Sequence, residues 1–412
     1  MQWCMRALIG AFVLAVSAPV SGQVRLGVEQ AVDVALRSRP ALKAEAEKVA
    51  AAEGQLRQAG VWPNPDFQFS NENLRPGETY TRDVDTLAVV SQPLDVLGKR
   101  GPRIDAAAAV VKRTGEELEL ARRQVAQRVK LAYWAARGAQ ERRGLLGASV
   151  ENFKKIVDYH AAQLRVGAIP EQDVLRVRLE SEQLQIAAHL AEADATAARV
   201  RLLKEMGRPV TEAVVLTEPL DGTSAIESAD AANAVSRRSE VRVAQAAVAA
   251  AAANARWQDT QARPDLGVMY GYKRTLLPDA PAGVNTAIAG VRITIPLFDR
   301  NQGNRDAAAA EARRQQQLLA EAELDAQGDL ERAQQEYQLR SAEVANTLRP
   351  LRDHAMEIAG IARAAYQQGA VDLLRLLDAE RARLDADRAW VDGMVAYQQS
   401  AVNLAFAQGA AR

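Results

Sequence analysis

The side chains best suited to metal binding or proton transfer are three histidines, His160, His189 and His354. No two of them are spaced i, i+4, and no cysteine accompanies any of them, so one chain does not supply the ligands of a zinc site. His160 lies close to a predicted chain reversal at Gly167, where three copies could form a ring. A solvent-exposed histidine is the simpler interpretation, and it is the one we expect.

Other catalytic arrangements are missing from the sequence. Neither Gly-x-Gly-x-x-Gly, Gly-x-Ser-x-Gly nor any other Gly-rich phosphate loop occurs. The 52 Asp and Glu residues balance 52 Lys and Arg, and they fall on predicted helix faces where solvated charge is the default. No stripe of Lys and Arg suggests nucleic acid. We therefore predict no enzyme, no cofactor, no resident metal and no nucleic-acid partner.

The N-terminus, residues 1–22, reads as a signal peptide. Arg6 precedes an apolar run over residues 7–16, and small residues follow, with cleavage expected after Ala18 or Gly22. Cys4 is the only cysteine and precedes the apolar run, so it should leave with the signal peptide; disulfides are then excluded. No later run of 18 apolar residues exists, so a membrane crossing would have to use β-strands.

The chain repeats itself, with one copy over residues 23–208, a linker over 209–228 and a second copy over 229–412. The landmarks are Arg39 with Arg238, Pro65 with Pro264, Pro93 with Pro296, and Gly167 with Gly369. Their offsets are 199, 199, 203 and 202 positions. The offset changes between the two prolines that bracket each predicted hairpin, and length changes belong in exposed loops.

In each copy, the spacing of apolar residues changes from the helical pattern to the alternating pattern of β-strands. Helices are predicted over 28–36 and from Pro40 to about Gly60. Alternating segments then predict β-hairpins at about 65–94 and 264–297, with strands over 67–71, 86–93, 266–272 and 287–295. Residues 75–83 and 276–283 carry Pro, Gly and Asp, and we expect them to be the hairpin loops.

Two very long helical rods follow the hairpins, from Gly101 to Val166 and from Gly303 to Gln368. About 65 residues at about 1.5 Å each give a length of about 97 Å, which suits coiled coil. We expect a bend in each rod, near Gly144 and Gly147 in the first and near Pro350 in the second.

The chain then reverses at Gly167 and Gly369, and the returning helices end at Gly207 and Gly409. Pro170 suits the first turn of the returning helix.

Four strands cannot close a barrel, and every strand edge must be paired in lipid. Three chains with four strands each would give a twelve-strand barrel. The predicted fold is therefore mainly α with a small β part. The chain would be one protomer of a trimeric twelve-strand outer-membrane β-barrel on a long periplasmic α-helical barrel.

At this point the chain resembles the TolC family of outer-membrane factors, from about residue 25 to 409. The motifs that carry the resemblance are Pro63-Asn64-Pro65, Ser91-Gln92-Pro93-Leu94 and Leu97-Gly98-Lys99-Arg100-Gly101. They look most like the branch that serves heavy-metal resistance pumps of the cobalt–zinc–cadmium type. Many proteins of that branch are lipoproteins, and this chain lacks the cysteine for it.

The resemblance implies a homotrimeric efflux duct in outer-membrane lipid, docked on a periplasmic membrane-fusion adaptor and a proton-driven inner-membrane RND pump. It places the gate at the periplasmic tip, with Asp173 pairing with Tyr366 of a neighbouring reversal and Asp378 in an acidic ring. Arg375 stands where some relatives carry another acidic residue. The residues implied for adaptor docking are Arg165, Val166, Gly167, Ala168, Gln368, Gly369, Ala370 and Val371.

Two alternatives remain at the level of sequence. Within the same class, the duct would export drugs, or proteins by type I secretion. A different class is a periplasmic coiled-coil scaffold or the adaptor itself, which would have no membrane strands.

Overall fold

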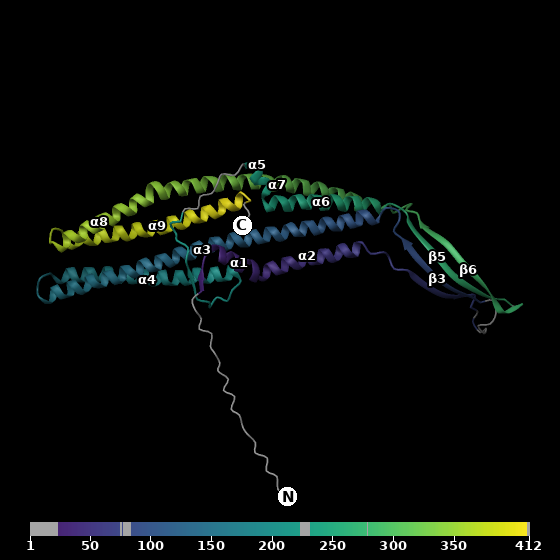
Figure 1. The fold of residues 1–412 in the computed structure, drawn as a ribbon, viewed down its shortest axis with the longest axis horizontal. Helices are drawn as coiled ribbons and strands as arrows, with labels where there is room; N and C mark the ends of the chain where they lie inside the picture. Colours follow the sequence, from purple (N-terminus) through teal and green to yellow (C-terminus); the bar gives the residue numbers. More distant parts are fainter. Residues whose placement is uncertain (1–23, 75, 77–83, 223–230, 278, 410–412) are drawn as a thin grey trace, which may run out of the picture.

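The fold is a long array of helices with a four-stranded sheet at one end (Figure 1). A computed structural model describes residues 24–74, 76, 84–222, 231–277 and 279–409. The predicted signal peptide and Cys4 lie outside the described residues. Within those ranges, no helix combines the length and the apolar character that crossing a membrane requires.

The first copy contains two short helices, a β-hairpin and a long helical hairpin. Its elements are α1 (Val28–Ser38), α2 (Pro40–Ala59), β2 (Asp66–Glu72), β3 (Asp85–Leu94), α3 (Arg100–Arg165) and α4 (Glu171–Met206). Pro40 begins α2, since its fixed φ suits a first helical turn. Gly207 ends α4 at φ 69°, a left-handed conformation that glycine adopts without strain. Pro170 is the N-cap of α4, one position earlier than expected.

The second copy follows the same order of elements. They are α5 (Ala231–Arg237), α6 (Ser239–Thr260), β5 (Asp265–Leu277), β6 (Ala280–Thr294), α7 (Gln302–Glu343), the π-helical segment η1 (Val344–Leu348), α8 (Arg349–Gln367) and α9 (Leu373–Ala407). Gly409, at φ 64°, follows α9 as Gly207 follows α4.

The two rods differ where both were expected to bend. The helix α3 runs unbroken through Gly144 and Gly147, because glycine keeps its backbone N–H and costs a helix only about 1 kcal/mol. The second rod changes to a π-helical turn immediately before Pro350. Proline lacks the N–H that would bond four residues back, and the wider turn accommodates that loss. The rod formed by α7 and α8 is visibly bowed in Figure 1.

The sheet has the strand order β2-β3-β5-β6, and all its pairs are antiparallel. The pairing of β3 with β5 joins the hairpins of the two copies into one sheet. Gly271 of β5 crosses β3 so closely that a Cβ there would stand 2.6 Å from the carbonyl oxygen of Ala88. A side chain at this position would push the two strands apart.

The strands of the second hairpin extend further into its expected loop than predicted. We expected a loop over 276–283, but Leu277 of β5 pairs with Ala280 of β6, so two residues separate the strands. The loop expected over 75–83 falls almost entirely outside the described residues.

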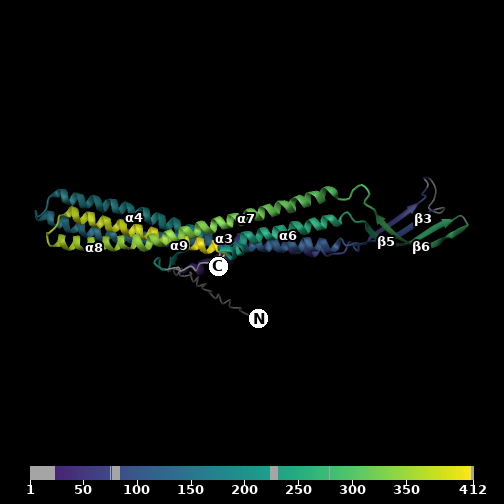
Figure 2. The same ribbon diagram turned by 90° about the horizontal axis from the view of Figure 1, so that it is seen from above.

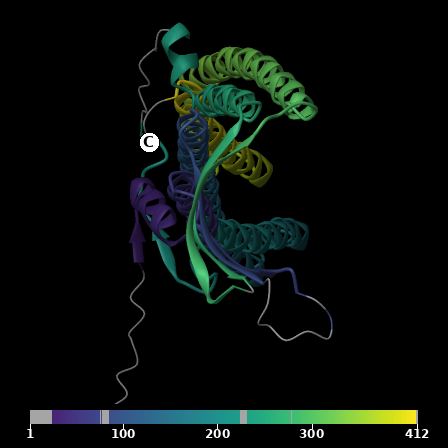
Figure 3. The ribbon, with the colours of Figure 1, turned by 90° about the vertical axis from the view of Figure 1, so that its right-hand side faces the viewer.

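The helices form a curved layer rather than a closed bundle, as the end-on view in Figure 3 shows. At the end far from the sheet, contacts run from α4 to α3, from α3 to α9 and from α9 to α8. Nearer the sheet they run from α2 to α3, then to α6 and α7. Figure 2 shows the same helices aligned with the long axis.

The linker between the copies contains a strand that the sequence did not predict. β4 (Val214–Leu216) pairs in parallel with β1 (Val24–Leu26). The buried hydroxyl of Tyr133 on α3 donates to the carbonyl of Leu26 at 2.9 Å and accepts from the N–H of Glu218 at 3.1 Å. The apolar run at 213–216 therefore attaches the linker to the central core.

Candidate functional site at the tip of the helical hairpins

The two chain reversals at the far end are the same turn built twice. Gly167 has φ 73° and Gly369 has φ 72°. The N–H of Ala168 bonds to the carbonyl of Gln163 at 3.0 Å, and that of Ala370 to Ala365 at 2.9 Å. This six-to-one bond with a left-handed glycine is the Schellman pattern that ends helices. The two predicted reversals are therefore confirmed.

The residues expected to dock an adaptor lie at these two reversals. Most of them are exposed, and Val166 exposes 79% of its surface.

The four residues expected at a gate lie on three helices next to the reversals. Asp173 is half-buried in the first turn of α4, where the helix dipole favours a carboxylate. Arg375 and Asp378 are exposed, three residues apart on one face of α9. Tyr366 lies in the last turn of α8 and is partly buried. Asp372 caps α9 by accepting from the N–H of Arg375 at 3.0 Å.

Tyr366 hydrogen-bonds to a residue that the sequence led us to discount. Its hydroxyl lies 2.7 Å from Nε2 of His160, and the two rings stack at 5.8 Å. His160 is only 1% exposed, so the expectation of a solvent-exposed histidine is wrong. Phe153, Val177 and Leu377 from three helices belong to the apolar cluster against which Tyr366 packs. His160 lies seven residues after Phe153, on the same face of the helix, and this spacing was the sequence signal that His160 is buried.

Asp173 acts on Tyr366 through its charge. Burial, then Tyr159, then the negative charge of Asp173 raise the pKa of the Tyr366 hydroxyl. The structure thus brings Asp173, Tyr366 and His160 into one neighbourhood within a single chain. Arg375 and Asp378 belong to the exposed face of α9 instead.

A second polar cluster, also missed, joins α8 to α9 behind the tip. Glu380 is 1% exposed and lies between Arg363 of α8 and Arg383 of α9. One heptad later, Asp387 pairs with Arg352 at 3.0 Å and with Arg383 at 2.9 Å. Both carboxylates lie on the buried face of α9, at positions where the heptad spacing would place apolar side chains. An unpaired charge there would be costly.

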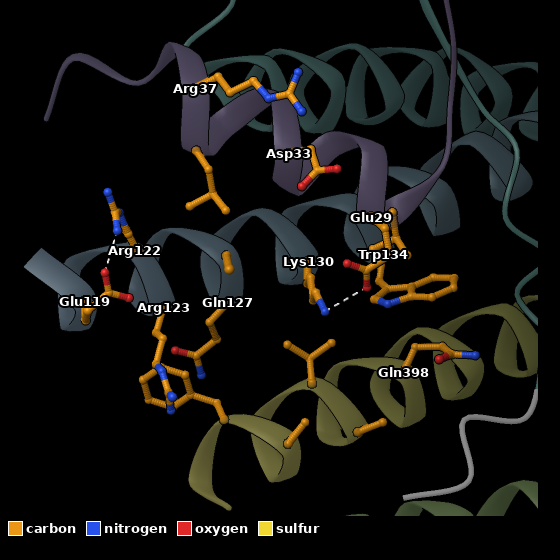
Figure 4. A pocket seen from close by; sticks show the side chains of 17 residues that line it. Glu29, Asp33, Arg37, Glu119, Arg122, Arg123, Gln127, Lys130, Trp134 and Gln398 are labelled. Carbon is orange, nitrogen blue, oxygen red and sulfur yellow. Dashed lines mark hydrogen bonds and ion pairs between the residues drawn. The ribbon is translucent and has the colours of Figure 1, made fainter. Parts of the chain in front are cut away.

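A hollow with a volume of about 790 Å³ lies far from the tip, between α1, α3 and α9 (Figure 4). Charged side chains on its walls pair with each other, as Lys130 does with Glu29 at 2.9 Å. Arg123 donates to the carbonyl of Gly409 at 3.0 Å. In the part of the chain that the structure describes, no three His, Cys, Asp or Glu side chains are grouped to hold a metal ion.

Comparison with known proteins identifies the family. The model of the family described as "Outer membrane efflux protein" matches residues 31–208 and 231–410. The cobalt-zinc-cadmium resistance protein CzcC of Cupriavidus metallidurans is 26% identical over 365 residues, covering 88% of this chain and 84% of CzcC. The nickel-cobalt-cadmium resistance protein NccC of Alcaligenes xylosoxydans xylosoxydans is 25% identical over 295 residues, which are 70% of this chain and 64% of NccC.

A solved structure has the same fold. The structure of CusC, a protein studied for the conformational changes that accompany folding and transmembrane channel formation, superposes with a TM-score of 0.75. The match covers 93% of this chain and 92% of CusC at 21% sequence identity.

Proposed function

The chain belongs to the outer membrane efflux protein family, and we propose that three copies of it form the exit duct of a tripartite pump for heavy-metal cations. It is an outer-membrane efflux channel whose helical part lies in the periplasm. Membership of this family argues against the alternative of a periplasmic scaffold or adaptor.

The observation that best supports the trimer is the pair of open edges on the protomer. One edge consists of β2, α2 and α4, and the other of β6, α7 and α8. The two edges differ, so copies must join head to tail, and such contacts close into a ring when the rotation allows. Three copies supply twelve strands, enough for a barrel without free strand edges.

Apolar side chains along the helical edges fit this contact. On α4, Leu175, Leu179, Ile186 and Leu190 expose 56%, 53%, 62% and 63% of their surfaces. Their spacing of 4, 7 and 4 residues puts them on one stripe, opposite the buried face of α4. On α8, Leu351, Ile358 and Ile361 form a second stripe, exposed by 47%, 56% and 62%.

The two stripes lie at the same height above the tip. Ile186 stands sixteen residues after Pro170, and Leu351 stands sixteen residues before Gln367. At about 1.5 Å per residue, both lie about 24 Å from their reversal. Packing α4 of one copy against α8 of the next would bury both stripes.

The sheet has one face suited to lipid. Phe67, Val90 and Tyr270 lie side by side across three strands and expose 69%, 45% and 68% of their surfaces. Val291 and Ile293 of β6 add exposures of 64% and 56%. Gln68, Ser91 and Arg292 alternate with them and point to the opposite face. An apolar outer face with a polar inner face is the pattern of membrane barrels.

Heavy-metal cations are the cargo that the relatives support, because CzcC and NccC are both named for metal resistance. The exposed Asp378, repeated by three copies, would form a negative collar at the tip. Arg375 beside it would weaken that collar. The exposed reversals would meet a periplasmic adaptor, which in turn would bind an RND pump.

Deletion of the gene from its host tests the cargo. The deletion strain should lose tolerance to one or more of zinc, cobalt, cadmium and nickel, and the wild-type gene should restore it. Loss of tolerance to hydrophobic drugs alone would overturn the metal assignment while keeping the duct. Failure to secrete a protein would point to type I secretion instead.

A further inference from the structure

The hydrogen bond between His160 and Tyr366 has a defined direction. Nδ1 of His160 lies 2.7 Å from the carbonyl oxygen of Ile156. A carbonyl only accepts, so Nδ1 carries a proton, and a neutral ring then has its lone pair on Nε2. With the ring neutral, the Tyr366 hydroxyl donates to Nε2. Since a hydroxyl has one proton, Tyr366 cannot at the same time donate to Asp173.

This bond connects the two helical hairpins of the protomer. His160 belongs to α3, in the hairpin of α3 and α4, while Tyr366 belongs to α8, in the hairpin of α8 and α9. Arg363 lies three residues before Tyr366 on α8 and pairs with Glu380 of α9. Both partners of this ion pair therefore belong to the same hairpin, that of α8 and α9. A movement of one hairpin against the other keeps the Arg363 pair and breaks the His160 bond.

A second link between the hairpins lies at the surface. Arg381 of α9 pairs with Glu180 of α4 through two nitrogens, with Nε 2.9 Å from Oε2; the Arg381 side chain is 52% exposed and that of Glu180 12%. Exposed ion pairs contribute little because water and salt screen them. The His160–Tyr366 bond is partly buried, and breaking it leaves the nearly buried His160 ring without a partner for Nε2, which costs more.

We propose that His160 is a positioning residue that holds Tyr366 and thereby clamps the two hairpins together at the tip. This inference rests on the proposed function, because it assumes that the tip is where the duct opens. In this chain the imidazole of His160 occupies the place at Tyr366 that family resemblance assigned to the Asp173 carboxylate. Opening the tip requires the bond between His160 and Tyr366 to break.

Tyr366→Phe is the sharpest test, because it removes one oxygen atom and leaves the stacked ring. In single-channel recordings from planar bilayers, the fraction of time that the channel is open should rise about fivefold, the factor that corresponds to one net hydrogen bond. His160→Leu should raise it similarly. His160→Gln, which can still accept through Oε1, should restore part of the wild-type behaviour.

The double variant His160→Leu with Tyr366→Phe separates a clamp from simple packing. If both residues act through one bond, the double variant opens no more than either single variant. Effects that multiply would overturn the proposal. If His160→Leu does not fold, His160→Gln takes its place. Its open fraction should lie between those of the wild type and Tyr366→Phe, and a value as high as that of Tyr366→Phe would overturn the proposal.

Tyr159→Phe is the matched control. Tyr159 precedes His160, is 55% exposed and contacts the His160 ring edge-on, and its hydroxyl accepts from Gln163 at 2.8 Å. It should leave the open fraction unchanged. If wild-type protein forms no channel at all, the proposed function fails. If it conducts and Tyr366→Phe changes nothing, only the clamp fails.

Discussion

Gly138 of α3 lies directly against Val395 of α9, with no room between them for a single methyl group. A Cβ built on Gly138 would overlap Cγ2 of Val395, and Cγ1 of Val391 would stand 3.9 Å away. A valine side chain in a helix has one strongly preferred rotamer, so Val395 cannot swing aside cheaply. At this crossing, the backbone of α3 from the first copy therefore packs directly against valine side chains of α9 from the second copy.

Gly138→Ala should destabilise the protein by about 1–3 kcal/mol, the usual cost of overpacking a filled core. Gly144→Ala in the same helix is the control: no atom lies within 4 Å of its built Cβ, and alanine should stabilise the helix by about 0.5–1 kcal/mol. Thermal unfolding in detergent, followed by circular dichroism at 222 nm, compares the two. Equal melting temperatures would contradict the packing at Gly138.

The sequence contained most of the fold because its landmarks act locally. Proline and glycine control helix ends by their own backbone preferences, so Pro40, Gly167, Gly207 and Gly369 could be interpreted without tertiary information. Whether α3 bends at Gly144 could not be decided from the sequence, because glycine permits a bend without requiring one. The pairing of β1 with β4 joins segments about 190 residues apart, and no local signal reports such a partner.

Ile186→Asp should prevent trimer formation, because it places a charge in the apolar stripe that we assign to the contact between copies. Gln185→Asp is the control, since Gln185 is exposed on the same helix but about 100° around its axis. Size-exclusion chromatography with light scattering of outer-membrane extracts gives the mass of each complex. A trimer of the Ile186→Asp protein would remove α4 from the interface.

Asp378→Asn should lower the preference of the channel for cations, because three negative charges would disappear from the constriction that we propose at the tip. The reversal potential of single channels across a potassium chloride gradient measures this preference. Asp385→Asn, on the same helix with a side chain that is 74% exposed, should leave it unchanged. Selectivity that survives Asp378→Asn would remove Asp378 from the constriction.

Arg375→Ala should act in the opposite direction and strengthen the cation preference, because it removes the positive charge three residues from Asp378. The same reversal-potential measurement applies. A weaker cation preference in Arg375→Ala would show that this arginine does not oppose the collar.

The stacked tyrosines Tyr337 of α7 and Tyr397 of α9 predict a loss of stability in alkali. Burial, followed by the 3.3 Å hydrogen bond to Tyr337, raises the pKa of Tyr397 to about 12. An unfolded tyrosine ionises near pH 10, so the folded state retains its proton longer. This contribution is complete below pH 10 and disappears as the pH rises to about 12.

Melting temperatures between pH 8 and pH 12 check this expectation. The wild-type melting temperature should fall more steeply above pH 10 than that of Tyr397→Phe, which has no proton to lose. Tyr159→Phe, a change at an exposed hydroxyl, should follow the wild type. Identical slopes for wild type and Tyr397→Phe would contradict the assignment.

The polar centre of the tip was harder to predict than the turns around it. Glu380 and Asp387 fall seven residues apart in the same line as Leu373 and Leu384, so their burial was readable in the heptad spacing of α9. Their partners Arg363 and Arg352 come from α8. Because α8 and α9 carry several arginines, the sequence did not indicate which of them would form these ion pairs. His160 lies one heptad after the buried Phe153, which signalled its burial, but its partner Tyr366 comes from α8 and could not be identified from spacing.

Disulfide trapping of the contact between α4 and α8 tests the ring most directly. In a Cys4→Ser background, which removes the only native cysteine, Ile186→Cys and Leu351→Cys should form bonds between neighbouring copies in outer-membrane vesicles. Non-reducing gels should show covalent dimers and trimers with nothing larger, and each single-cysteine protein should give no trimer. Monomer alone, or a ladder that continues past three copies, would contradict a closed three-chain duct.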